Sequence, residues 1–385
     1  MFQNIQTRLR VRGRGLALAL NNRRADGRRL AHLGFDLSTN AGDIALSEAS
    51  RAVFDTDEAV SWWIGGVRDP VTPRRIDQLN SMRGVLVGGG GAFLSDTNTN
   101  AISGWQWAIS KEQVGQLRVP LALFALGYNR FRGQAPFDAR FADNVAAIVE
   151  KAFFAGLRNR GSIAALRSYL PENLAAKLVY QPCPTTVLSF LRLGAAARTT
   201  ARQPVLALNA AFDRSALRFG ASRQRTLRGL AMVAKAAGDD GWSIKVLCHQ
   251  LDDAQITPAL REAGVQFSLT HLAGQSAHRT IAAYRAVDLA IGIRGHAQTI
   301  AFGLGVPIIS VVTHNKLQWF LDDIGHPDWG VETREEDFPD RLMAAYRAAA
   351  AALPERRAQV AAAREKLWVI TQQNVATVRH AFRLN

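Results

Sequence analysis

The chain has 385 residues, which is long for a single hydrophobic core and suits two domains of ordinary size. Hydrophobic residues make up 48% of it and charged residues 21%, and this balance excludes an intrinsically disordered chain. The formal net charge of +15 indicates anionic partners, but no basic helix interleaved with aromatic residues and no familiar nucleic-acid motif accompanies it, so we expect no nucleic-acid partner.

The two cysteines, Cys183 and Cys248, lie far apart and form no CxxC pair. They indicate neither a disulfide framework nor a zinc site, and we expect no metal in this protein. No apolar run approaches the roughly 20 residues that span a bilayer, and the apolar patch at 16–20 is too short for a signal peptide. The simplest interpretation is a cytoplasmic protein.

The first 29 residues form a basic extension with eight arginines and a single acidic residue, Asp26. Alternating polar and apolar residues in TRLRVRG and LALAL predict a small hairpin. One interpretation is a solvated, irregular extension. The other is a patch that rests on anionic lipid headgroups, which would hold the protein peripherally at the inner face of the membrane.

A core strand predicted at 30–35 leads into an Asn40-x-Gly42-Asp43 turn that opens a helix. Such a turn lets the backbone approach a ligand closely. Asp43 could equally serve only as a helix cap. Both interpretations of this turn are open at the level of the sequence.

Four glycines, Gly88–Gly91, follow a strand predicted at 84–87. Glycine has no side chain to pack, so Gly89 and Gly90 either make a tight turn or expose backbone to a ligand. The run lacks the spacing of GxGxxG and the lysine of a P-loop, which argues against those two nucleotide-binding motifs.

A further strand is predicted at 119–126, and polar side chains follow it. Among them, Asn129 and Arg130 lie just beyond the strand, where a parallel sheet usually presents its binding site. A helix is expected over 139–157. The weakly patterned stretch 191–203 is interpreted as the linker between two domains.

A second α/β unit begins with a strand at 205–209, and Arg214 and Arg218 lie shortly after it. Strands and helices then alternate again until the Ala-rich C-terminal segment, which is helical in composition. The predicted parts are the basic extension at 1–29, an N-terminal domain at 30–190, a C-terminal domain at 204–335 and terminal helices at 336–385.

The stretch 288–316 carries the strongest signal in the chain. Two short, β-branched runs at 288–293 and 307–312 predict buried parallel strands with a helix between them. Arg294 and His296 therefore lie where a strand gives way to a helix N-terminus, which favours an anionic ligand. A histidine at this place can donate or accept a proton near neutral pH.

In their order and spacing these pieces resemble the polysaccharide pyruvyl transferase family. The family carries an Asn-x-Gly-Asp turn, a glycine-rich strand end, an Arg-x-His before a small-residue helix, a Gly-Val-Pro and a Lys. The matching residues are Asn40, Gly42, Asp43, Gly88–Gly91, Arg294, His296, Gly305, Val306, Pro307 and Lys316. One departure is Gly295, which stands where the family usually has Leu.

The resemblance implies an α/β fold of two Rossmann-like domains facing across a cleft, as in glycosyltransferases of the B type, with C-terminal helices. It implies transfer of pyruvate from phosphoenolpyruvate to two hydroxyls of one sugar, giving a cyclic ketal and phosphate without any cofactor. The acceptor would be an exopolysaccharide, capsule or cell-wall glycan, lipid-linked or oligomeric. The C-terminal domain would bind the donor and the N-terminal domain the acceptor.

On this interpretation His296 is the general acid that protonates the terminal carbon of the enol, and Asp43 is the candidate base for the acceptor hydroxyls. Arginine forks and a lysine suit the carboxylate and phosphate of the donor. The expected donor-binding residues are Arg294, Gly295, Lys316, Arg214 and its competitor Arg218. The expected acceptor-side residues are Asn40, Gly42, Gly89, Gly90, Asn129 and Arg130.

Two alternatives belong to other classes of function. A glycosyltransferase of the two-domain B type that uses a nucleotide-sugar could employ Arg214 and Lys316, although no obvious Glu stands at the ribose position after the donor strand. A non-catalytic protein that binds polysaccharide at a membrane could keep the same fold, and Gly295 leaves that alternative open.

Overall fold

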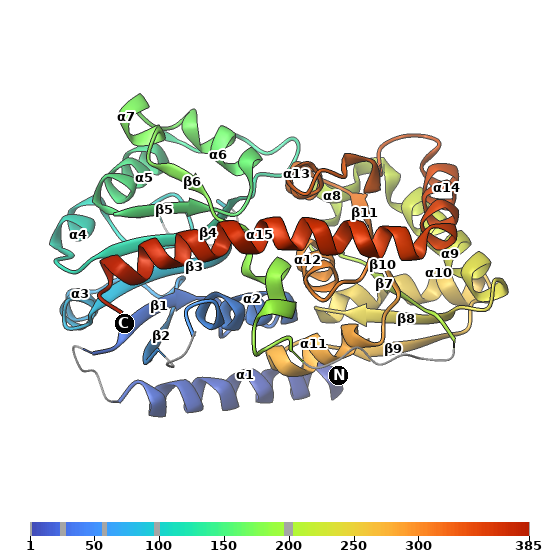
Figure 1. Ribbon diagram of the computed structural model, residues 1–385, viewed down its shortest axis with the longest axis horizontal. Coiled ribbons are helices and arrows are strands. Elements are labelled where there is room, and N and C mark those ends of the chain that lie inside the picture. The colour runs from blue at the N-terminus through green and yellow to red at the C-terminus, as the bar shows by residue number, and fades with distance from the viewer. Residues whose placement is uncertain (1, 24–27, 56–59, 96–100, 196–202, 385) are drawn as a thin grey trace.

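The computed structural model describes residues 2–23, 28–55, 60–95, 101–195 and 203–384. They form two α/β domains side by side, each built on a six-stranded sheet whose neighbouring strands are all parallel (Figure 1). Short, apolar strands of this kind need helices on both faces, because a parallel sheet is buried on both sides.

The N-terminal sheet has the order β2-β1-β3-β4-β5-β6. Its strands are β1 Leu30–Gly34, β2 Trp62–Gly66, β3 Gly84–Phe93, β4 Leu121–Tyr128, β5 Phe154–Leu157 and β6 Leu178–Tyr180. The helices of this domain are α2 Ala41–Ala52, α3 Pro73–Asn80, α4 Lys111–Gln116, α5 Ala139–Lys151, α6 Arg160–Arg167 and α7 Glu172–Ala175. The short helix η1 (Pro184–Phe190) leads out of it.

The C-terminal sheet has the order β12-β11-β10-β7-β8-β9. Its strands are β7 Val205–Asn209, β8 Ser243–Cys248, β9 Phe267–His271, β10 Leu289–Gly292, β11 Ile308–Val312 and β12 Gly330–Glu332. Its helices are α8 Ser215–Phe219, η2 Gly220–Ser222, α9 Arg223–Asp239, η3 Leu251–Ile256, α10 Thr257–Glu262, α11 Ala277–Arg285, α12 Gly295–Gly303, α13 Asn315–Asp323, η4 Pro327–Trp329 and α14 Phe338–Ala351.

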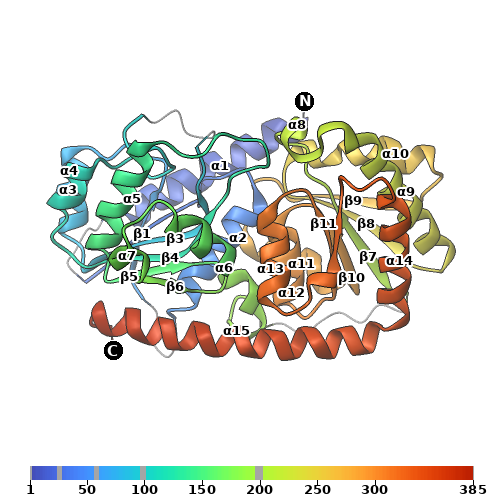
Figure 2. The ribbon, with the colours of Figure 1, turned by 90° about the horizontal axis from the view of Figure 1, so that it is seen from above.

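The last helix, α15 (Leu353–Ala381), runs across both domains (Figure 2). Near its start Arg357 pairs with Asp288 of the C-terminal domain at 2.5 Å. Just after its end, Phe382 is buried and packs edge-on against Phe153 of the N-terminal domain. The helix therefore ties the two domains together. Among the described elements, no other helix is as long.

The predicted strand–helix–strand unit around residue 296 is confirmed. Strands β10 and β11 pair in parallel, and α12 connects them. Gly305, just after α12, has a φ of +84°, a left-handed conformation that favours glycine at a helix end. The predicted two-domain α/β architecture is confirmed as well, since each domain contains one parallel sheet.

The predicted N-terminal hairpin is wrong, because residues Phe2–Asn21 form a helix, α1. Alternation within TRLRVRG and LALAL suggested strands, but over the longer window the apolar residues recur at helical spacing. Ile5 and Leu9 are four residues apart, as are Leu16 and Leu20, and all four lie on one side of the helix.

The helix predicted over 139–157 is also wrong in its last third. Helix α5 ends at Lys151, and the four residues Phe154–Leu157 form β5, buried between β4 and β6. A strand of four residues shows no periodicity of its own, so a single sequence does not separate it from the helix before it.

The glycine run is part of a strand rather than a turn after one. Strand β3 continues through Gly88–Gly91 to Phe93, with a shift in its register to β4 beyond Gly90. Gly89 and Gly90 have positive φ values of 79° and 104°. An added Cβ at Gly89 would come within 3.0 Å of Leu46 on α2, so these glycines allow α2 to pack closely on the strand.

Candidate active site

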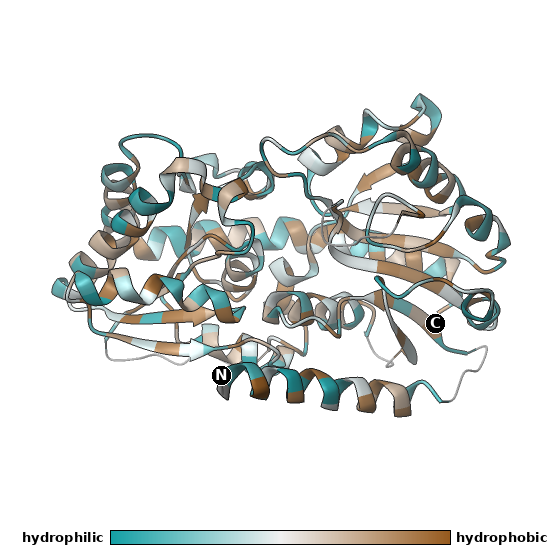
Figure 3. Cartoon of the chain, turned by 180° about the vertical axis from the view of Figure 1, so that it is seen from behind, coloured by the Kyte–Doolittle hydropathy of each residue, from teal (hydrophilic) through white to brown (hydrophobic). Residues whose placement is uncertain are grey.

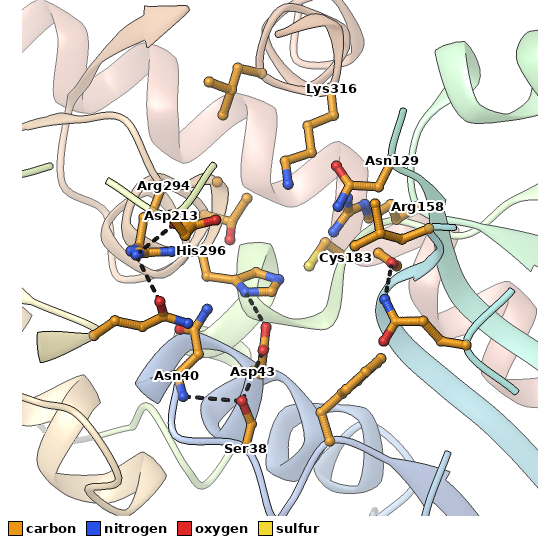
Figure 4. Close-up of a pocket in the computed structure, with 18 of the residues that line it drawn as sticks. Ser38, Asn40, Asp43, Asn129, Arg158, Cys183, Asp213, Arg294, His296 and Lys316 are labelled. Atoms are coloured by element: carbon orange, nitrogen blue, oxygen red, sulfur yellow. Dashed lines mark hydrogen bonds and ion pairs between the residues drawn. The ribbon is translucent and has the colours of Figure 1, made fainter. Parts of the chain in front are cut away.

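A cavity of about 740 Å³ lies between the two domains (Figure 4). Its wall consists of segments that follow the carboxyl ends of β1 to β6 in one domain and of β7, β8, β10 and β11 in the other. Because all these strands are parallel, their ends meet at the same edges of the two sheets, and these edges face each other. The predicted cleft between the domains is therefore present.

Arg294 is the N-cap residue of α12 and lines this cavity. Its Nε and Nη2 atoms donate to the buried carboxylate of Asp253 at 2.5–3.0 Å, and Nη2 also lies 2.9 Å from Asp213 Oδ1. Within the described part of the chain, Nη1 makes no hydrogen bond. The two carboxylates raise the pKa of Arg294 against the effect of burial, so its charge and orientation are fixed.

His296 follows in the first turn of α12 and meets the N-terminal domain. Its Nδ1 lies 3.3 Å from Asp43 Oδ1, and Asp43 Oδ2 accepts a hydrogen bond from Ser38 Oγ at 3.1 Å (Figure 4). The other ring nitrogen, Nε2, is buried and makes no hydrogen bond with any described residue. One side of the imidazole is thus held by a carboxylate, and the other faces the cavity beside the Cys183 thiol.

The charge state of this histidine depends on its neighbours. Burial disfavours the imidazolium, but the Asp43 carboxylate and the Cys183 thiol outweigh burial and raise the pKa of His296. Burial would raise the pKa of Asp43, whereas the contacts with His296, Arg68 and Ser38 lower it on balance. Asp43 is therefore ionised and favours a protonated His296.

Gly42 determines how closely the two domains approach at this point. An added Cβ would overlap with His296 Cβ and would come within 3.0 Å of His249 Nδ1. The helix cap is Asn40, whose Oδ1 accepts a hydrogen bond from the Gly42 amide at 2.9 Å. Because Asn40 caps α2, the carboxylate of Asp43 is left to contact His296.

The C-terminal domain supplies further cations to the cavity. Arg218 is buried, and it donates to the carboxylate and the carbonyl of Asp213 at 2.9 and 2.8 Å, while its Nη1 has no partner among the described residues. Arg214 pairs with the same carboxylate at 3.5 Å. The ammonium of Lys316 points into the cavity (Figure 4), and burial together with Arg158 and Arg218 lowers its pKa well below the usual value.

Several lining residues were not predicted from the sequence, among them two arginines and a cysteine. Arg158 follows β5 and Cys183 follows β6, while Arg68 follows β2 and donates to Gln106 Oε1 at 2.7 Å. Arg158 Nη2 is buried without a hydrogen bond to the described residues. The rule that ligands meet strand ends would have identified Arg158 if β5 had been recognised.

The structure separates the other predicted residues into two groups. Gly295 and Asn129 line the cavity. By contrast, Arg130 is exposed and donates to the carbonyl of Gln134 at 2.9 Å, and Gly89 and Gly90 pack under α2 away from the lining.

Gly295 leaves room at the cavity wall. An added Cβ would meet only Leu317 at 3.8 Å and Lys316 at 3.9 Å, which are ordinary contacts. The structure therefore has space at the position where the related family usually carries leucine.

Comparison with known proteins agrees with this geometry. A model of the family described as polysaccharide pyruvyl transferase matches residues 40–315, which is more than half of the chain and includes the arginines that line the cavity, while Lys316 lies one residue beyond the match. The chain belongs to the polysaccharide pyruvyl transferase family. The predicted enzyme class is thereby confirmed at the level of the family. A search of curated proteins finds no significant match to this pyruvyl transferase.

Solved structures resemble this chain in fold. The UDP-GlcNAc 2-epimerase from Neisseria meningitidis bound to UDP-GlcNAc has a TM-score of 0.54 and 10% identity, over 92% of this chain and 99% of that one. Sucrose-phosphate synthase from Thermosynechococcus elongatus has a TM-score of 0.52 and 13% identity, over 92% and 98%. These likenesses confirm the predicted glycosyltransferase-B-like fold, with two Rossmann-like domains.

Proposed function

We propose that this enzyme uses phosphoenolpyruvate as its donor and transfers pyruvate to two hydroxyls of one glycan sugar. The observation that supports the proposal best is a set of buried nitrogen atoms that surround the cavity without partners among the described residues. They are Arg158 Nη2 and Arg218 Nη1, and His296 Nε2, the proposed proton donor, lies beside the same space. Buried donors without partners are costly, so a ligand rich in anionic oxygens fits this cavity.

The cations match a donor with two anionic groups. Phosphoenolpyruvate carries a carboxylate and a phosphate, and each group accepts several charge-assisted hydrogen bonds. Arg294 would present Nη1 to one of these groups while Asp253 holds the rest of its guanidinium. Lys316 and Arg158 enter the cavity from opposite domains and would meet the other group. Binding an anion there would restore the lowered pKa of Lys316.

His296 is assigned as the general acid. Its imidazolium would give the Nε2 proton to the terminal carbon of the enol, leaving an oxocarbenium-like centre at the adjacent carbon. One sugar hydroxyl then forms a bond to that carbon and loses its proton, the carbon–oxygen bond to phosphate breaks, and the second hydroxyl forms the other bond. The second hydroxyl then releases its proton. Protonation of the carbon consumes one proton and the two hydroxyls release two, of which the departing phosphate takes up one.

Asp43 is assigned a role in returning those protons. Both of its oxygens have partners in Ser38 and His296, so it acts on the acceptor through His296. Once His296 has given up its proton, the neutral imidazole backed by the Asp43 carboxylate becomes a base for a hydroxyl. The acceptor glycan would approach from the N-terminal domain, where Asn129 and Asn40 line the cavity. None of the steps proposed for these residues uses a cofactor.

Calorimetric titration with phosphoenolpyruvate, without acceptor, tests the donor assignment. Each lost charge-assisted hydrogen bond is worth about 1.5–3 kcal/mol, so Arg158→Met and Lys316→Met should each weaken binding by roughly 10- to 100-fold. Arg130→Met is the matched control, because Arg130 is exposed outside the cavity and should bind as the wild type does. Binding of a nucleotide-sugar at a concentration where phosphoenolpyruvate does not bind would establish the glycosyltransferase alternative instead.

A further inference from the structure

Helix α1 exposes a row of large apolar side chains to solvent. Ile5, Leu9, Leu16 and Leu20 are exposed to 50%, 61%, 63% and 60%. Their spacing places all four on one side of the helix, which lies along the edge of the molecule (Figures 1 and 3). An apolar face of this kind, which Arg12 interrupts between Leu9 and Leu16, marks an interaction site on a surface helix rather than scattered exposed residues.

The opposite face of α1, which contacts the protein, is mainly polar, with Val11 and Leu18 half-buried on it. Thr7 is buried there, and Arg14 donates to the carbonyls of Asp36 and Gly274 at 3.1 and 2.9 Å. Near the end of the helix, Asn22 exchanges hydrogen bonds with the backbone of Ile64 on β2 at 2.6 and 3.0 Å. An ordinary surface helix turns its apolar side inward, whereas this one is attached by hydrogen bonds and turns its apolar side outward.

The charge beside the apolar row is positive. Helix α1 contains no acidic residue, and Arg8 and Arg12 are exposed next to Ile5, Leu9 and Leu16 on the same half of the helix. Leucine and isoleucine on one side with arginine beside them are typical of helices that lie in the interface of a bilayer and bind anionic lipid. A partner with an apolar interior and an anionic surface matches both features.

We propose that α1 docks this protein onto a membrane of anionic phospholipid, with its axis in the plane of the bilayer. The four apolar side chains enter the headgroup and acyl boundary, and Arg8 and Arg12 contact lipid phosphates. Among the described residues, no helix is long and apolar enough to cross a membrane. A helix that lies in the plane of the bilayer gives a peripheral and reversible attachment.

The position of α1 also relates the membrane to the cavity. Arg14 holds the carbonyl of Asp36, and the next residue, Leu37, lines the cavity and lies beside Gly15 of the helix. Leu37 is itself 44% exposed. The loop at the mouth of the cavity thus lies next to the docking helix. This part of the inference rests on the proposed function: an acceptor carried on a membrane lipid would reach the cavity from this side.

Co-sedimentation of the full chain with vesicles tests the docking. We expect binding to vesicles of phosphatidylcholine with phosphatidylglycerol, and much weaker binding to phosphatidylcholine alone or at high salt. Leu16→Gln/Leu20→Gln should reduce partitioning by about 100-fold, since burial of each leucine contributes roughly tenfold or more. Arg8→Gln/Arg12→Gln should reduce binding to the anionic vesicles only.

The matched control is Val369→Gln, which replaces an apolar residue exposed to 49% on α15, a helix on another face of the molecule (Figure 2). It should bind vesicles as the wild type does. Wild-type sedimentation that the leucine substitutions leave unchanged would overturn the proposal. So would a concentration-dependent dimer that the same substitutions disrupt while vesicles fail to bind, because the apolar row would then belong to a second copy. Titration with phosphoenolpyruvate is independent of both results, so the donor assignment can fail or hold separately.

Discussion

The two sides of the cavity carry their positive charge in different ways. On the C-terminal side, Arg294 is held by the carboxylates of Asp253 and Asp213. On the N-terminal side, Arg158 has no ion pair with the described residues, and burial lowers its pKa. A guanidinium with a carboxylate behind it keeps its geometry when the cavity is empty, whereas one without such a partner gains most from an anionic ligand. Arg294 therefore contributes to the stability of the fold and to the position of the ligand, whereas Arg158 contributes to the affinity for the ligand.

The largest effect that this comparison predicts is on folding. Arg294→Ala leaves the carboxylate of Asp253 buried without its partner, and breaking a buried pair in this way costs about 3–5 kcal/mol. Arg158→Ala removes a buried charge that has no ion pair with the described residues. The free energy of unfolding of this variant should therefore equal or exceed that of the wild type. Urea denaturation of both variants measures the difference. Equal losses of stability would show that the two arginines do not differ in the way described.

His296 lies between the two sides, and its replacement should affect turnover rather than binding. General acid catalysis contributes roughly 10²- to 10⁴-fold, so His296→Ala should lose about that factor in kcat. The affinity for phosphoenolpyruvate should stay close to that of the wild type, because the arginines and Lys316 supply the binding. Equal loss of donor affinity and of turnover would contradict the role as an acid. Single-turnover kinetics beside calorimetry separate the two outcomes.

Asp43 links the sides, and Asp43→Asn should shift the pH profile. Asp43 and Cys183 raise the pKa of His296 against burial, so that removing the charge of Asp43 lowers this pKa. The acid form of His296 is present below its pKa and is lost as the pH rises through it. The alkaline limb of kcat/KM should therefore move to lower pH in the variant. A limb that stays in place would assign it to another group, such as Lys316.

The smallest expected effect is at Gly295, on the cavity wall beside Arg294. Gly295→Ala adds a methyl group in ordinary contact with Leu317 and Lys316, at a position without positive φ. The free energy of unfolding should change by less than about 1 kcal/mol. Gly295→Leu would place a larger side chain in this space, as is usual in the family. Activity with acceptors of different size, measured for both variants, tests whether the space at Gly295 determines the acceptor size. A large loss of stability in Gly295→Ala would show that the glycine is required by the backbone.

Parts of the site were predictable because they lie at strand ends with clear patterns. β10 and β11 are buried, apolar runs, and so the sequence alone places Arg294, His296 and Lys316 at the sheet edge. Arg158 could not, since β5 has only four residues and continues a helical pattern. Asp253 was missed for a different reason: a carboxylate near the start of a helical segment resembles a cap, and only the fold brings it to Arg294.

The sequence by itself determined the alternation of strands and helices, the division into two domains, and the order of the motifs that places the chain in its family. These follow from local periodicity and spacing, which each segment carries without its neighbours. The tertiary structure alone decided which charges are paired and which are not. It also decided that Gly42 brings Asp43 to His296 across the domains, and that α1 turns its leucines outward. Pairing and exposure depend on contacts between residues far apart in the chain, and no local pattern contains them.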